Sequence, residues 1–224
     1  MSVCGKSALF FDLDGTLIDS VPDLAGALNV MLHRLGLGGC DETQVRDWIG
    51  DGARTLVRRA LLAQMDDRKA QEMFDVALAI FMEAYGTMLC EKTVPYPGVD
   101  ETLTYCRKKG SVMALVTNKP ERFVAPILRT MGWGHLFDAV VGGDTLTTKK
   151  PDPAPLLHLC QTLSIRPEEV WMVGDSCNDI LAAERAGIRS AGVVWGYGAD
   201  AFGKRCKPTV TIGRMTELKE ILNG

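Results

Sequence analysis

The chain has 224 residues, of which 46% are hydrophobic, which is enough for one large domain or for a core with a smaller appendage. Its 25 basic and 28 acidic side chains give a formal charge of −3, which excludes a general nucleic-acid surface. No apolar run approaches the length of a membrane span and the first residues do not resemble a signal peptide, so we expect no membrane partner and a cytoplasmic location.

Short apolar runs alternate with helical patterns along most of the chain. The runs are continuous rather than alternating in polarity, which predicts strands buried on both faces at residues 7–11, 111–117, 138–143, 168–175 and 190–194. The patterns between them predict helices at residues 98–110, 120–132, 152–165 and 178–187. This order predicts an α/β fold with a doubly wound, Rossmann-like parallel sheet.

One interval breaks the alternation. Residues 21–93 show helical periodicity and no convincing strand, and they start just past the first predicted strand. The chain returns through "TVPYPGVD", whose two prolines suit a hinge. We therefore expect an α/β core domain of residues 1–20 and 94–224, with an inserted α-helical cap domain of residues 21–93 over the carboxyl ends of the strands.

The first predicted strand ends in two carboxylates, in the stretch "FFDLDGT". Asp12 and Asp14 are separated by one residue, and burying two neighbouring carboxylates is costly unless a cation or a proton compensates. An EF-hand calcium loop does not fit, because its glycine falls at the sixth position and Gly15 would fall at the fourth. The pair therefore predicts a different kind of cation site.

Polar side chains also follow three later strands. They are Thr117 and Asn118, then Lys150, then Asp175 with Asp179 four residues further on. Taken singly, each has a structural explanation as a helix cap or a solvated side chain. Their shared position at strand ends favours one common site, because the carboxyl ends of parallel strands meet at one edge of the sheet.

The motifs D-x-D-G-T, Thr-Asn, Lys-Pro and G-D-x-x-x-D, in this order, resemble the haloacid dehalogenase superfamily of phosphotransferases over the whole chain. Within it, the helical insertion with "WIGDGARTLVRRAL" and the later stretch "GGDTLTTKKPDPAPLL" are similar to bacterial phosphoglycolate phosphatases. Asp51 departs from this pattern, since a neutral residue such as Asn is expected there.

Phosphoryl transfer can be built on these side chains. A phosphate ester repels an anionic nucleophile, so attack by Asp12 requires a cation, for which Mg²⁺ is suited. We expect Asp12, Asp175 and the backbone carbonyl of Asp14 to bind Mg²⁺, with Asp179 one step further from the ion. Attack would form an aspartyl-phosphate on Asp12, while Asp14 would protonate the leaving alkoxide and then activate water.

The remaining candidates bind the substrate. Lys150 is expected to neutralise charge on the phosphate and the nucleophile, and Thr117 and Asn118 to bind the transferring oxygens. In the cap, backbone N–H groups near Gly52, or the side chain of Arg54, are expected to bind a ligand carboxylate.

The resemblance implies hydrolysis of a small acidic phosphate ester, 2-phosphoglycolate, to glycolate and phosphate. Two alternatives stay open: a phosphatase or phosphomutase acting on another ester such as a sugar phosphate, and a non-catalytic module that binds Mg²⁺ and phosphate. A dehalogenase is less favoured, because such enzymes replace the second aspartate and Asp14 is present.

The seven cysteines are odd in number, widely scattered and without a C-x-x-C pair, which predicts reduced thiols. Cys177 lies beside acidic residues that disfavour its thiolate, so we do not expect it to be a nucleophile.

Overall fold

A computed structural model describes residues 8–223 and divides them into two compact units. The α/β unit holds the described residues up to Ile18 and from Pro95 onward, and the helical unit is Asp19–Val94. Two-residue strands, β2 (Ile18–Asp19) and β3 (Val94–Pro95), pair where the chain passes between the units. The first residue of the strand expected at 7–11 and the thiol of Cys4 lie outside the described residues.

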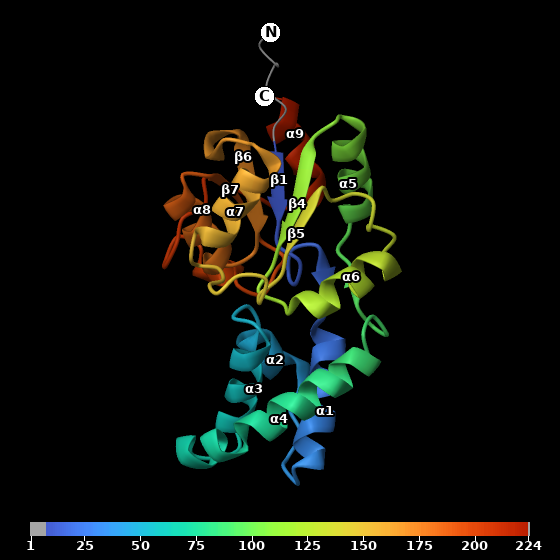
Figure 1. The fold of residues 1–224 in the computed structure, drawn as a ribbon, viewed down its shortest axis with the longest axis vertical. Helices are drawn as coiled ribbons and strands as arrows, with labels where there is room; N and C mark the ends of the chain where they lie inside the picture. The colour runs from blue at the N-terminus through green and yellow to red at the C-terminus, as the bar shows by residue number, and fades with distance from the viewer. Residues whose placement is uncertain (1–7, 224) are drawn as a thin grey trace. The chain divides into compact units, whose positions relative to one another are not determined.

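The α/β unit is built on a six-stranded sheet (Figure 1). Its strands are β1 (Ala8–Phe11), β4 (Val112–Val116), β5 (Ala139–Val141), β6 (Val170–Gly174), β7 (Arg189–Val193) and β8 (Val210–Ile212). They run in the order β5-β4-β1-β6-β7-β8, and every pair is parallel. The prediction of a doubly wound parallel sheet is confirmed, with β8 as a strand that the sequence did not predict.

Helices flank this sheet: α5 (Val99–Lys108), α6 (Glu121–Thr130), α7 (Ala154–Leu163), α8 (Cys177–Ala186) and the terminal α9 (Leu218–Asn223). Short 3₁₀ turns occur at Pro167–Glu169, Ala199–Ala201 and Met215–Glu217. Side chains of β1 and β6, among them Phe10 and Met172, are fully buried against Leu156 of α7 and Ala183 of α8. Burying each large apolar side chain contributes about 1.5–3 kcal/mol, so this layer holds the central strands against the helices.

The helical unit contains α1 (Val21–Arg34), α2 (Glu42–Trp48), α3 (Ala53–Leu62) and α4 (Asp67–Thr87). Both α1 and α3 pack on α4, where Phe81 and Tyr85 are buried. The buried carboxylate of Asp23, near the start of α1, accepts the backbone N–H groups of Lys92 at 2.9 Å and Thr93 at 3.0 Å. These hydrogen bonds connect the first helix of the helical unit to the segment in which the unit ends. None of the helices within residues 8–223 is long and apolar enough to cross a membrane.

Candidate active site

The candidate site lies where β1, β4 and β6 end. Strand order reverses around β1, and in open α/β sheets ligands bind outside the carboxyl ends of the strands at such a point. Asp12 directly follows β1, and its N–H group donates to Val173 O of β6 at 2.9 Å. The sheet hydrogen bonding thus continues to the nucleophile candidate and fixes its backbone.

Three carboxylates meet at this edge. Asp12, Asp175 and Asp179 each offer an oxygen within 4.8 Å of the others, and their residues are only 8%, 3% and 1% exposed. Asp175 follows β6, and Asp179 lies in the first turn of α8. The structure therefore brings together three of the residues that the sequence predicted.

Lys150 lies between the carboxylates. Its Nζ is 2.6 Å from each of three acceptors: Oδ1 of Asp12, Oδ1 of Asp179 and the carbonyl oxygen of Val116. Burial alone lowers the pKa of this ammonium, but the charges of Asp12 and Asp179 outweigh burial and raise the pKa above its ordinary value. Lys150 is therefore charged and held in one position.

The cluster carries more negative than positive charge. Burial raises the pKa of Asp12 well above its usual range, the charges of Asp179 and Asp175 act in the same direction, and Lys150 opposes them. Burial, followed by the Asp179 charge, raises the pKa of Asp175 to about 7. Three carboxylates with one ammonium leave a formal charge of −2, so the site is suited to a divalent cation.

Asp175 is held by donors from two loops. Its Oδ1 accepts the hydroxyl of Thr16 at 3.2 Å, and its Oδ2 accepts the backbone N–H groups of Tyr197 at 2.8 Å and Gly198 at 3.2 Å. Gly15 has a φ of +88°, and a Cβ atom there would lie 2.5 Å from Asp175 Oδ2. Only glycine fits this turn, which explains the glycine of the D-x-D-G-T motif.

Asp179 has a structural contact on each oxygen. Oδ1 pairs with Lys150, while Oδ2 accepts the N–H group of Ser176 at 3.1 Å and its hydroxyl at 2.8 Å. The latter bonds form a capping box at the start of α8.

Asp14 is paired with a residue that the sequence analysis did not single out. Lys119 Nζ lies 2.7 Å from Asp14 Oδ1 and 3.0 Å from Oδ2, and the two side chains are 3% and 14% exposed. Lys119 follows Thr117 and Asn118 in "VTNKP", which resembles the capped start of a helix. The signal that could have identified Lys119 as a site residue is its position directly after Thr117 and Asn118, at the end of a buried strand.

Thr117 and Asn118 continue β4 into the same edge and are both buried. Thr117 Oγ1 accepts the N–H group of Lys119 at 3.2 Å, and Asn118 Nδ2 donates to the carbonyl oxygen of Lys150 at 2.9 Å. These bonds fix the two loops that carry the lysines.

The cap candidates lie in the helical unit and are described within it. Gly52 is the N-cap of α3, with a φ of +83°. The exposed Arg54 places its guanidinium carbon 4.8 Å from the centre of the Phe74 ring. Asp51, the charge that departs from the phosphoglycolate phosphatase pattern, pairs with Arg59 at 2.5 Å, so its charge is locally compensated.

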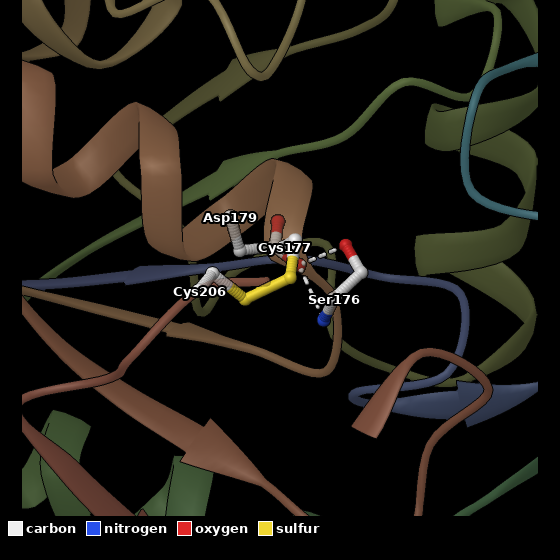
Figure 2. The surroundings of a disulfide bond; sticks show 4 residues. All are labelled: Ser176, Cys177, Asp179 and Cys206. Atoms are coloured by element: carbon white, nitrogen blue, oxygen red, sulfur yellow. Dashed lines mark hydrogen bonds between the residues drawn. A yellow bond between two sulfur atoms is a disulfide. The ribbon is translucent and has the colours of Figure 1, made fainter. Parts of the chain in front are cut away.

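A disulfide bond contradicts the prediction that all cysteines are reduced. Cys177, the first residue of α8, is bonded to Cys206, 29 residues further along the chain (Figure 2). Figure 2 shows the bond beside the hydrogen bonds between Ser176 and Asp179. The prediction was wrong because the return of the chain from β7 to β8 brings the two Cα atoms to 5.5 Å, which is typical of a disulfide. Cys40, Cys106 and Cys160 are thiols.

Comparison with known proteins agrees with this geometry. The haloacid dehalogenase-like hydrolase family model matches residues 9–193. Proteins named phosphoglycolate phosphatase are similar in sequence: that of Psychrobacter arcticus is 46% identical over 220 residues (97% of this chain, 96% of that protein), and that of Pseudomonas putida is 50% identical over 190 residues (84% and 70%).

A solved structure is also similar. The crystal structure of a predicted phosphoglycolate phosphatase from Haemophilus somnus superposes with a TM-score of 0.89 at 37% identity, covering 96% of this chain and 97% of that one. The resemblance predicted from the sequence motifs is confirmed: the chain belongs to the haloacid dehalogenase-like hydrolase family, among relatives that are phosphatases.

Proposed function

We propose that the chain is a Mg²⁺-dependent phosphomonoesterase that hydrolyses 2-phosphoglycolate through an aspartyl-phosphate on Asp12. The observation that carries the reaction type is the buried cluster of Asp12, Asp175 and Asp179 around Lys150, at the carboxyl ends of parallel strands. The proposed substrate is supported by the relatives named phosphoglycolate phosphatase at 46–50% identity.

The cluster fits Mg²⁺. Its donors are carboxylate oxygens, which magnesium prefers, and its excess negative charge is buried. Asp12 and Asp175, with the backbone carbonyl of Asp14, would hold the ion. Asp179 would lie one step further out, where its Oδ1 would hold the Lys150 ammonium and its Oδ2 the start of α8. When bound, Mg²⁺ would neutralise charge between the attacking carboxylate and the phosphate.

Asp12 would act as the nucleophile. Its Oδ1 is held by Lys150, and Oδ2 accepts no hydrogen bond from the described residues. In the first step an Asp12 oxygen bonds to phosphorus and the bond from phosphorus to the glycolate oxygen breaks. In the second step a water oxygen attacks phosphorus, which releases phosphate and regenerates the carboxylate.

Asp14 would transfer the protons of both steps. It would protonate the departing glycolate oxygen and then take a proton from the attacking water. Thr117 and Asn118 would bind the phosphoryl oxygens, because both side chains are buried at the end of β4, the strand next to β1.

The helical unit would act as a cap that excludes bulk water during the reaction. Its contribution to substrate binding would come from the N-terminal turn of α3, where the positive φ of Gly52 orients the first N–H groups. Arg54, two residues further on, supplies a guanidinium that is suited to a carboxylate.

Phosphate release from a panel of small phosphate esters, ranked by kcat/KM, tests this proposal. We expect 2-phosphoglycolate to rank first, ahead of sugar phosphates and an uncharged aryl phosphate. A sugar phosphate in first place would overturn the proposed substrate. Binding without turnover of any ester would indicate a non-catalytic module.

A further inference from the structure

Lys119 and Lys150 are the buried cationic side chains in the described part of the chain. Their side chains are 3% and 2% exposed, whereas every arginine and every other lysine within residues 8–223 is at least partly exposed. Taking an ammonium out of water costs several kcal/mol unless anionic partners compensate. Asp12 and Asp179 are these partners for Lys150, and Asp14 is the partner for Lys119.

The three N–H donors of Lys150 are all directed to groups of the chain. An ammonium has three N–H donors, and Lys150 directs them to Asp12, Asp179 and the carbonyl oxygen of Val116, all at 2.6 Å. A carboxylate on the substrate could bind Lys150 only by displacing one of these contacts.

Lys119 lies next to the atom that would receive the leaving group's proton. Its Nζ is 2.7 Å from Asp14 Oδ1, and a general acid operates about 2.6–3.2 Å from the oxygen that it protonates. The ammonium therefore lies within about 6 Å of the departing oxygen. In 2-phosphoglycolate the carboxylate carbon is two bonds of about 1.5 Å from that oxygen. The substrate carboxylate can therefore reach the Lys119 ammonium.

We propose that Lys119 is a specificity-determining residue that binds the leaving-group carboxylate of the substrate. This inference rests on the proposed hydrolysis of 2-phosphoglycolate and adds a residue of the α/β unit to its recognition. It is compatible with a contact from Arg54 of the cap, because a carboxylate has two oxygens and accepts several donors.

A different role for Lys119 would be to hold Asp14 in place. The two roles differ in their dependence on substrate. A residue that only positions Asp14 affects every alkyl phosphate to the same extent, whereas a residue that binds the carboxylate affects esters that carry one.

The test compares Lys119→Gln with the parent enzyme on two esters. Ethylene glycol monophosphate has the carbon skeleton of 2-phosphoglycolate with a neutral hydroxymethyl group in place of the carboxylate. Glutamine keeps an N–H donor beside Asp14 but removes the charge. Loss of the charged partner of Asp14 is expected to lower kcat/KM on both esters. We expect kcat/KM on 2-phosphoglycolate to fall about 10- to 100-fold further than kcat/KM on the neutral ester, the range of a lost charge-assisted hydrogen bond.

The matched control is Lys108→Gln. Lys108 is exposed at the end of α5, just before β4 begins, whereas the candidate site lies where β4 ends. The substitution removes the same charge as Lys119→Gln, and we expect the kinetics of the parent enzyme. Equal losses on the two esters in Lys119→Gln, or no loss on either, would overturn the inference while leaving the proposed function intact. A parent enzyme that hydrolyses the neutral ester but ignores 2-phosphoglycolate would overturn the proposed function, and the inference with it.

A second pair of variants covers the case in which Lys119→Gln does not fold. The double variant that combines Asp14→Asn and Lys119→Gln removes both charges of the buried pair. Calorimetry measures the affinity of this variant, and of Asp14→Asn alone, for each ester. We expect the double variant to bind 2-phosphoglycolate about tenfold or more weakly, with little change for the neutral ester. Equal affinities for 2-phosphoglycolate in the two variants would overturn the inference.

Discussion

Cys206→Ser opens the disulfide bond and is expected to lower the stability of the α/β unit. The bond between Cys177 and Cys206 spans 29 residues, including β7 and the loop whose N–H groups hold Asp175. In the chain-entropy account, a crosslink over a loop of this length contributes about 3.5 kcal/mol at 25 °C. For a protein of this size, that corresponds to a fall in Tm of about 7–14 °C.

Thermal unfolding followed by circular dichroism, with and without dithiothreitol, measures this effect. Reductant should lower the Tm of the parent towards that of Cys206→Ser and leave the variant unchanged. Cys40→Ser, which removes a thiol from the helical unit, is the control and should retain the response to reductant. If oxidised parent and Cys206→Ser unfold at the same temperature, the bond does not stabilise the protein and the reasoning is wrong.

Four further outcomes follow from the site. Asp12→Asn should abolish phosphate release while circular dichroism shows an intact fold; activity within about tenfold of the parent, about 1.4 kcal/mol of barrier, would contradict nucleophilic attack by Asp12. EDTA should abolish activity and Mg²⁺ restore it in preference to Ca²⁺, whose larger shell misplaces the phosphate; normal rates after chelation would exclude a metal role. Asp14→Asn should slow alkyl phosphates more than an aryl phosphate, because a phenolate leaves without a proton; equal losses would remove Asp14 from acid catalysis. Arg54→Ala and Gly52→Val should each lower kcat/KM for 2-phosphoglycolate about tenfold or more, with a much smaller loss for an aryl phosphate; parallel losses would mean that the cap does not bind the carboxylate.

The sequence predicted the α/β fold because buried parallel strands have a strong signature. The run from Ala8 to Phe11 is continuous and apolar since helices cover both of its faces, and the same holds for β4 and β6. The missed strand β8 has three residues, and its middle residue Thr211 is exposed. A short strand at the sheet edge leaves a pattern too brief to distinguish from a loop.

The sequence could predict those site residues whose positions follow from the order and pairing of the strands. Asp12, Thr117 and Asp175 each follow a strand, and parallel pairing brings strand ends together whatever the loops do. The ion pair between Lys119 and Asp14 was not predictable in this way. It depends on which direction a loop side chain takes after β4, and that direction is fixed by tertiary packing.

The disulfide shows where a composition rule fails. An odd number of scattered cysteines is typical of reduced thiols, but pairing depends on distances that only the fold sets. Disulfides in cytoplasmic proteins are rare, and those known are mostly transient, catalytic or redox-sensing. Alkylation of cell extracts followed by mass spectrometry would measure whether Cys177 and Cys206 are bonded in cells.

In the proposed mechanism, Asp12 carries the phosphoryl group during turnover. The most direct test of this step is mass spectrometry of the enzyme quenched in acid during hydrolysis of 2-phosphoglycolate with Mg²⁺. We expect a phosphoryl group on the peptide that contains Asp12, and none in Asp12→Asn. Steady phosphate release from the parent, with no phosphoryl group on Asp12 at any quench time, would contradict this mechanism.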